Sequence, residues 1–152
     1  MKDLQAILKQ EPVYMYEWKT RLDVIRDFEY IPFLETDHEN ALLWIMTNAF
    51  LSTGNSRMIT ALDKWKNINI LFASYECGSY DGDAFVLFER EGKLYEVNAS
   101  HCSCYGLEGQ FKPEVTTLDA LRYRLTKGTL GIDRIADVFA TRLKWFLGIP
   151  TE

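Results

Sequence analysis

The sequence predicts a single globular α+β domain over residues 1–152, and three observations lead to this fold class. The hydrophobic period is helical over residues 2–66, strand-like over residues 67–111, and helical again from residue 116 onward. Helices and strands that are segregated in this way are typical of α+β folds. A chain of 152 residues with 47% hydrophobic residues can also build one substantial core. We therefore expect N-terminal helices, a central antiparallel sheet of three or four strands, and two C-terminal helices.

Helical stripes dominate the N-terminal block. A short stripe lies over residues 4–8, and a longer one joins Trp18, Leu22, Ile25 and Phe28 at spacings of four and three. Pro32 limits this longer helix, because the residue before a proline avoids the α region. Two more helices are expected over residues 42–50, with Thr36 or Asp37 as N-cap, and over residues 56–65.

The central block has the signature of strands. Residues 68–75 and 84–88 are short runs rich in strand-forming residues, whereas residues 93–97 alternate between polar and apolar side chains. A turn at residues 90–92 joins the last two strands as a hairpin. Residues 76–83 are expected to form a loop, and residues 100–105 a fourth strand.

Two helices are predicted in the C-terminal block. Thr116 with Asp119 resembles a capping box, and the helix that follows ends at Gly128. Asp133 is the expected N-cap of the last helix, which ends at Gly148. The tryptophans of the helical blocks that lie on or beside apolar stripes are expected in the core: Trp18, Trp65 and Trp145.

The charge is concentrated in the centre of the chain. Residues 67–111 contain seven acids and two bases, which accounts for the whole formal net charge of −5. An acidic domain repels phosphate, so direct nucleic-acid binding is not expected, and a basic protein surface or a cation is the better partner. The N-terminus lacks a signal-peptide pattern, and no apolar run is long enough to cross a membrane. We expect a cytoplasmic protein with reduced cysteines.

A cysteine and histidine cluster lies in the same block. Cys77, His101, Cys102 and Cys104 are the ligand types of a structural zinc site, which makes zinc a possible cofactor. The Cys102-Ser103-Cys104 spacing departs from the usual zinc pattern, and on a strand His101 would face away from Cys102. The spacing therefore favours the other interpretation, in which these cysteines are small buried residues.

The same residues also offer the groups of a thiol enzyme. Cys77 or Cys102 would be the nucleophile, His101 the base, and Asp81 or Asp83 the residue that orients the base. No recognised catalytic signature surrounds them, so we do not predict an enzyme and keep this function as a second alternative.

An acidic surface that carries tyrosines is the preferred candidate site. Aromatic side chains among carboxylates suit a binding surface for a basic partner. The residues assigned to this surface are Tyr75, Tyr80, Asp81, Asp83, Tyr105 and Glu108.

A resemblance adds to this interpretation. The stretch over residues 70–110 resembles segments of small phage and prophage proteins of uncharacterised function. The resemblance is carried above all by DGDAFVLF (81–88), GKLYEVN (92–98) and SHCSCYGLEGQ (100–110). The resemblance implies a phage accessory context, in which anti-CRISPR and other anti-defence inhibitors occur. We therefore predict a stoichiometric inhibitor that binds a host defence protein, such as a CRISPR nuclease, through its basic nucleic-acid-binding surface. A zinc-binding module is the alternative.

Overall fold

The computed structural model describes residues 1–29, 60–77, 81–102, 106–127, 130 and 137–150. Several expected features lie outside these residues. They are the helix over 42–50 with its N-cap at Thr36 or Asp37, Asp133, and the candidate site residues Tyr80, Cys104 and Tyr105.

A five-stranded mixed sheet forms the centre of the molecule, which confirms the α+β class. Its order is β1 (Val13–Tyr16), β2 (Asn69–Cys77), β3 (Asp81–Arg90), β4 (Lys93–Cys102) and β5 (Glu114–Thr116). β1 pairs with β2 in parallel, and the other neighbouring strands are antiparallel. The expectation of a purely antiparallel sheet with three or four strands was wrong in these two respects.

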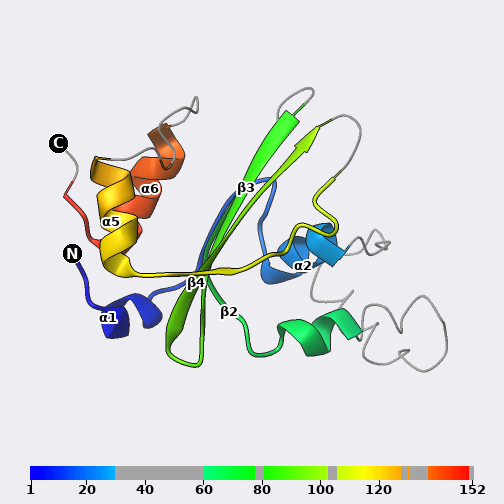
Figure 1. The fold of residues 1–152 in the computed structure, drawn as a ribbon, viewed down its shortest axis with the longest axis horizontal. Coiled ribbons are helices and arrows are strands. Elements are labelled where there is room, and N and C mark those ends of the chain that lie inside the picture. Colours follow the sequence, from blue (N-terminus) through cyan, green and yellow to red (C-terminus); the bar gives the residue numbers. More distant parts are fainter. Residues whose placement is uncertain (30–59, 78–80, 103–105, 128–129, 131–136, 151–152) are drawn as a thin grey trace.

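Helices cover both faces of this sheet (Figure 1). The helices α1 (Leu4–Leu8), α5 (Leu118–Thr126) and α6 (Asp137–Leu147) lie on one side, which we call the α6 face. On the other side, the α2 face, lie α2 (Arg21–Glu29), a helical segment over residues 60–65, and the loop over residues 106–111. Because β2 and β3 are buried on both faces, they contain the apolar runs over residues 70–73 and 84–88, whereas β4 alternates.

Aromatic rings fill the core of the α2 face. Trp18 and Trp65 are fully buried there, and Phe28 lies between them with ring centroids 5.8 and 6.1 Å away. Phe111 from the loop packs on Trp65 at 4.2 Å, and the loop is held to β4 by Gln110, whose side chain bonds both backbone groups of Ser100. The loop therefore completes this core beside α2 and the helical segment over residues 60–65.

The α6 face has a more aliphatic core with four phenylalanines. A bulge at the start of β2 shifts the register between Ile70 and Phe72. As a result Leu71 and Phe72 both point into the α6 face, where Phe72 packs on Phe139 and Phe146 of α6. An ion pair between a buried carboxylate and a partly exposed arginine lies at the border of this face, with Arg124 Nη1 of α5 2.6 Å from Glu96 Oε1 of β4.

Several element boundaries differ from the expectations. β2 and β3 extend through most of the expected loop over 76–83, and residues 100–102 continue β4 instead of starting another strand. The N-cap of α5 is Thr117, whose side chain accepts a hydrogen bond from Ala120 N, while Thr116 belongs to β5. Trp18 precedes α2 but is buried as expected, whereas Trp145 is 59% exposed and is not a core residue.

Candidate functional site

Most of the candidate residues meet at one end of the sheet, where β2 and β4 end and β3 begins. We call this the open end. The strand register aligns Cys77 of β2 with Gly82 of β3, and Gly82 with His101 of β4. The described candidates at the open end are Tyr75, Cys77, Asp81, Asp83, His101 and Cys102.

Three of these side chains make contact on the α2 face. The His101 ring crosses β3, with its Nε2 3.5 Å from Cys77 Sγ and its Nδ1 2.9 Å from the Tyr75 hydroxyl. Cys77 is exposed and His101 half-buried, whereas Tyr75 is only 9% exposed and packs on Trp18. The site therefore runs from solvent to the aromatic core through a thiol, an imidazole and a phenol.

Gly82 makes this contact geometrically possible. β2 and β4 are two strand spacings apart, about 9.5 Å, so an imidazole on β4 reaches β2 only by lying over the middle strand. A Cβ added at Gly82 would lie 2.5 Å from His101 Cε1 and 2.6 Å from the Glu76 carbonyl oxygen. Glycine is therefore required beneath the ring.

Tyr75 is placed to hold the imidazole rather than to bind a partner. Burial is the largest cause of its raised pKa, and the neighbouring Cys77, Asp27 and Glu17 raise it further. The phenol therefore stays protonated at neutral pH. Its ring lies inside the core, so the role expected for Tyr75 on a partner-binding surface does not fit its position.

The two hydrogen bonds of His101 are coupled through its tautomer. When the Cys77 thiol donates a hydrogen bond to Nε2, the ring hydrogen is on Nδ1, and Nδ1–H donates a hydrogen bond to the Tyr75 oxygen. When Nε2–H instead donates to sulfur, the Tyr75 hydroxyl donates to Nδ1. The first arrangement gives His101 the geometry of a base for Cys77, with Tyr75 in the orienting role that the sequence assigned to Asp81 or Asp83.

Carboxylates lie on the opposite face of the open end. Side chains alternate along a strand, so Glu76, Asp81 and Asp83 point to the α6 face. Glu76 and Asp83 are directly opposed across β2 and β3. Glu17 follows β1 at the same end, and its backbone N–H donates to the Tyr75 carbonyl oxygen at 3.1 Å. Its carboxylate acts electrostatically on Tyr75 and Asp27, so Glu17 extends the acidic charge to the α2 side of this end. We call these four residues the acidic end.

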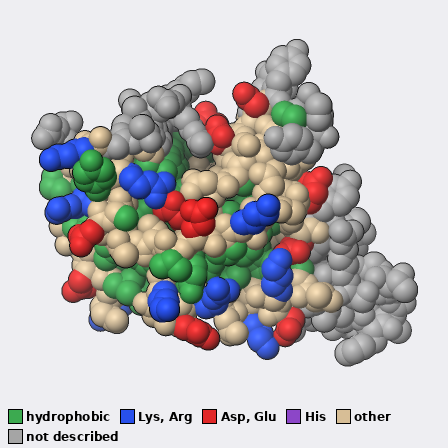
Figure 2. All heavy atoms as spheres, in the orientation of Figure 1, with side chains coloured by type: hydrophobic (Ala, Val, Ile, Leu, Met, Phe, Trp, Pro, Cys, Tyr) green, Lys and Arg blue, Asp and Glu red, His purple; other side chains and the backbone are tan. Residues whose placement is uncertain are grey.

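The structure also shows which acids of the central block are balanced. Glu96 is buried against Arg124, and Glu89 and Glu91 share the β3–β4 turn with Arg90 and Lys93. Figure 2 shows acidic side chains at the top, where β3 begins, whereas Lys and Arg side chains are interspersed with acids toward the turn. Of the ion pairs among the described residues, none involves Glu17, Glu76 or Asp81.

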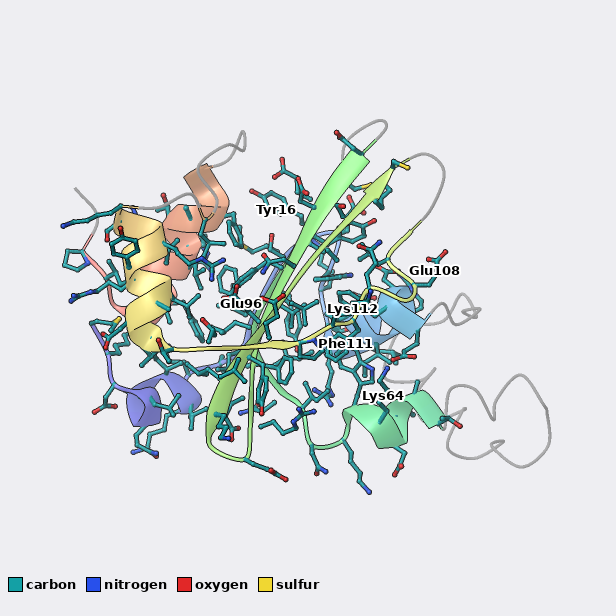
Figure 3. All side chains as sticks on the ribbon, viewed as in Figure 1. Tyr16, Lys64, Glu96, Glu108, Phe111 and Lys112 are labelled. Atoms are coloured by element: carbon teal, nitrogen blue, oxygen red, sulfur yellow. The ribbon has the colours of Figure 1, made fainter. Side chains whose placement is uncertain are left out.

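Glu108 and Cys102 are separated from the groups with which the sequence associated them. Glu108 lies on the loop of the α2 face, near Phe111 and Lys112 (Figure 3). Cys102 follows His101 on β4 and so points to the α6 face, opposite Cys77. Within the described ranges, no group of three or more His, Cys, Asp or Glu could hold a metal ion. The zinc hypothesis stays a prediction, with Cys77 and His101 as the two ligands that meet.

Sequence reasoning missed two residues of this end. Glu17 was not connected to it because the four-residue strand β1 was not recognised. Gly82 was interpreted only as a turn residue, since nothing in its local sequence reveals that a ring lies over it. The signal for Gly82 would have been a β2 that continues to Cys77 and a β3 that begins at Asp81.

The comparisons add no relative to this description. No protein-family model, curated protein or solved structure matches the chain. Among the described helices, none is both long and apolar enough to cross a membrane.

Proposed function

We propose that this chain is a protein-binding inhibitor whose acidic end occupies a basic, nucleic-acid-binding surface of a partner. The observation that carries the proposal is the clustering of acidic side chains. Glu17, Glu76, Asp81 and Asp83 lie together at one end of the sheet. Toward the other end, acids and bases are mixed, with Glu89 and Glu91 beside Arg90 and Lys93. An anionic patch of this kind is complementary to a surface that ordinarily binds phosphates.

The resemblance of residues 70–110 to phage and prophage proteins supports a host defence protein as the partner. A CRISPR nuclease has the required surface chemistry, since such effectors hold nucleic acid in positively charged channels. Occupation of that channel by carboxylates would block substrate access without chemistry on the inhibitor. The expected stoichiometry is therefore one inhibitor for each channel.

The test is binding to purified CRISPR effector nucleases, measured by calorimetry at two salt concentrations, with DNA cleavage as the second measurement. We expect Asp81→Lys with Asp83→Lys to weaken binding by about tenfold or more, and binding to weaken as salt rises. Glu89→Lys with Glu91→Lys makes the same change of charge at the β3–β4 turn and is the matched control. Equal loss of binding in both variants, or no binding to any effector, contradicts the proposal.

A further inference from the structure

The contact of Cys77, His101 and Tyr75 has a consequence that is independent of the acidic end as a binding surface. We propose that Cys77 is a modification site, a thiol activated by His101 that forms mixed disulfides with small neutral or positively charged disulfides. The exposed sulfur, the base 3.5 Å away and the phenol on the far ring nitrogen carry the proposal together.

The first step is a proton transfer within the site. A thiolate is the attacking form of cysteine, and the His101 imidazole lies within hydrogen-bond distance of the Cys77 sulfur to accept the thiol proton. The Cys77 proton passes to His101 Nε2, while Nδ1–H donates to the Tyr75 oxygen. Because Tyr75 is buried in the aromatic core and Gly82 leaves room for the ring, the imidazole is held in place before any reagent arrives.

The second step is exchange at sulfur. Cys77 Sγ attacks one sulfur of a small disulfide, so that a bond from Cys77 to that sulfur forms and the original S–S bond breaks. The released thiolate takes the proton from His101 Nε2. Cys77 is oxidised to the mixed disulfide and half of the reagent is reduced to a thiol, so that the disulfide itself is the oxidant.

Charge at the open end determines which disulfides react. Asp81 and Asp83 flank Gly82 along β3, and Glu76 precedes Cys77 on β2. These carboxylates point to the opposite face, but each is only one or two residues along a strand from Cys77 or from its neighbour Gly82. That spacing corresponds to about 3–7 Å along the backbone, which is within the screening length at physiological salt. They attract a cationic disulfide and repel an anionic one.

Three disulfides of different charge test the proposal: cystamine (cationic), 2-hydroxyethyl disulfide (neutral) and 3,3′-dithiodipropionate (anionic). The rate of mixed-disulfide formation at each cysteine is followed by peptide mass spectrometry of the full chain. We expect Cys77 to react about tenfold faster with cystamine than in the urea-unfolded chain. For each reagent we divide the Cys77 rate in the native chain by the rate in the unfolded chain. We expect this ratio to be about fivefold larger for cystamine than for the anionic disulfide.

Two variants distinguish activation from simple exposure. His101→Gln retains a polar side chain without a base, so mixed-disulfide formation at Cys77 should be about tenfold slower. The rate at Cys102 should stay unchanged and serves as the internal control. Asp81→Asn with Asp83→Asn should abolish the charge preference but retain the fast reaction. If His101→Gln fails to fold, the comparison of native with unfolded wild-type chain still decides the result.

Three outcomes would overturn the proposal. One is a Cys77 rate that is no faster in the native than in the unfolded chain, and another is an unchanged rate in a folded His101→Gln variant. The third is a stoichiometric zinc ion that protects Cys77 until a chelator is added, since the pair would then be a metal site.

Discussion

The two faces of the sheet are built differently, and the difference is largest at the open end. The α2 face has a core of stacked and tilted aromatic rings that continues through Trp18 and Tyr75 to His101 and Cys77. The α6 face has an aliphatic core with phenylalanines and ends in the carboxylates of Glu76, Asp81 and Asp83. One strand end thus presents reactive groups on one side and fixed charge on the other, because successive side chains alternate.

Because the thiol site and most of the acidic side chains lie on opposite faces of the sheet, the two candidate functions can be separated by mutation. Core changes on the α2 face should reach the thiol site through packed rings, whereas changes on the α6 face should alter stability without reaching it.

The largest effects are expected from truncation of a buried ring in either core. Trp65→Ala and Phe72→Ala should each lower the free energy of unfolding by about 3–5 kcal/mol, because each leaves a cavity among packed rings. Urea denaturation measures the loss. The comparison of faces further predicts that Trp65→Ala alone shifts the His101 imidazole resonances in NMR spectra. An equal shift in Phe72→Ala would show that the faces are coupled.

The ion pair between Arg124 and the buried Glu96 has the next largest expected effect. Glu96 is only 4% exposed, so Arg124→Ala leaves a buried carboxylate without its partner and should cost about 2–3 kcal/mol. Glu96→Gln combined with Arg124→Met removes both charges and should cost less than Arg124→Ala alone. A double variant that is less stable than the single one would mean that the pair itself contributes net stability.

Gly82→Ala tests the close approach of His101 to β3. The added Cβ would overlap the ring and the Glu76 carbonyl oxygen. We therefore expect the free energy of unfolding to fall by about 1–3 kcal/mol and mixed-disulfide formation at Cys77 to be slower. Gly106→Ala is the matched control, since a Cβ there comes close only to the Glu108 side chain, which can move. Thermal denaturation of both variants gives the comparison, and equal losses would exclude a special role for Gly82.

Tyr75→Phe should cost about 1 kcal/mol at neutral pH through the lost hydrogen bond to His101. Burial raises the pKa of the folded-state phenol above its ordinary value of 10.0, so above pH 10 the unfolded chain releases a proton that the folded chain retains. Stability therefore falls as pH rises above 10, and this fall should be shallower in Tyr75→Phe. Nitrogen NMR shifts of His101 should also show loss of the Nδ1–H tautomer, which a purely structural tyrosine would not affect.

The smallest effect is expected at the acidic end. Glu76 opposes Asp83 across the strands, so Glu76→Gln removes a repulsion and should stabilise the fold by about 0.5 kcal/mol at low salt. The gain should shrink as salt rises. A destabilised variant would indicate that Glu76 makes a favourable contact that outweighs the repulsion.

Local sequence patterns predicted the elements that have a clear period or a strong terminator. The hairpin of β3 and β4, the stripe from Leu22 to Phe28 and the helix that ends at Gly148 were all recognised in this way. The strands β1 and β5 were missed because three or four residues carry too little periodicity. The extension of β2 and β3 was missed because Asp and Gly at residues 81–83 are typical of turns.

The candidate site was only partly predictable for the same reason. The sequence pointed to Cys77 and His101, but their contact depends on the register of three strands and on the absence of a side chain at Gly82. The assignment of Tyr75 to a surface failed because burial depends on Trp18, which is distant in sequence. Local composition contains neither kind of information.

The sequence by itself determined the fold class, the hairpin and the concentration of charge in the central strands, since these follow from periodicity and composition. The tertiary structure decided which of those charges are neutralised: Glu96 meets Arg124 only because α5 packs on the α6 face. It also decided which residues face each other across the strands. Both outcomes depend on contacts between distant segments, and those contacts form only when burial of two apolar faces fixes the register of the sheet.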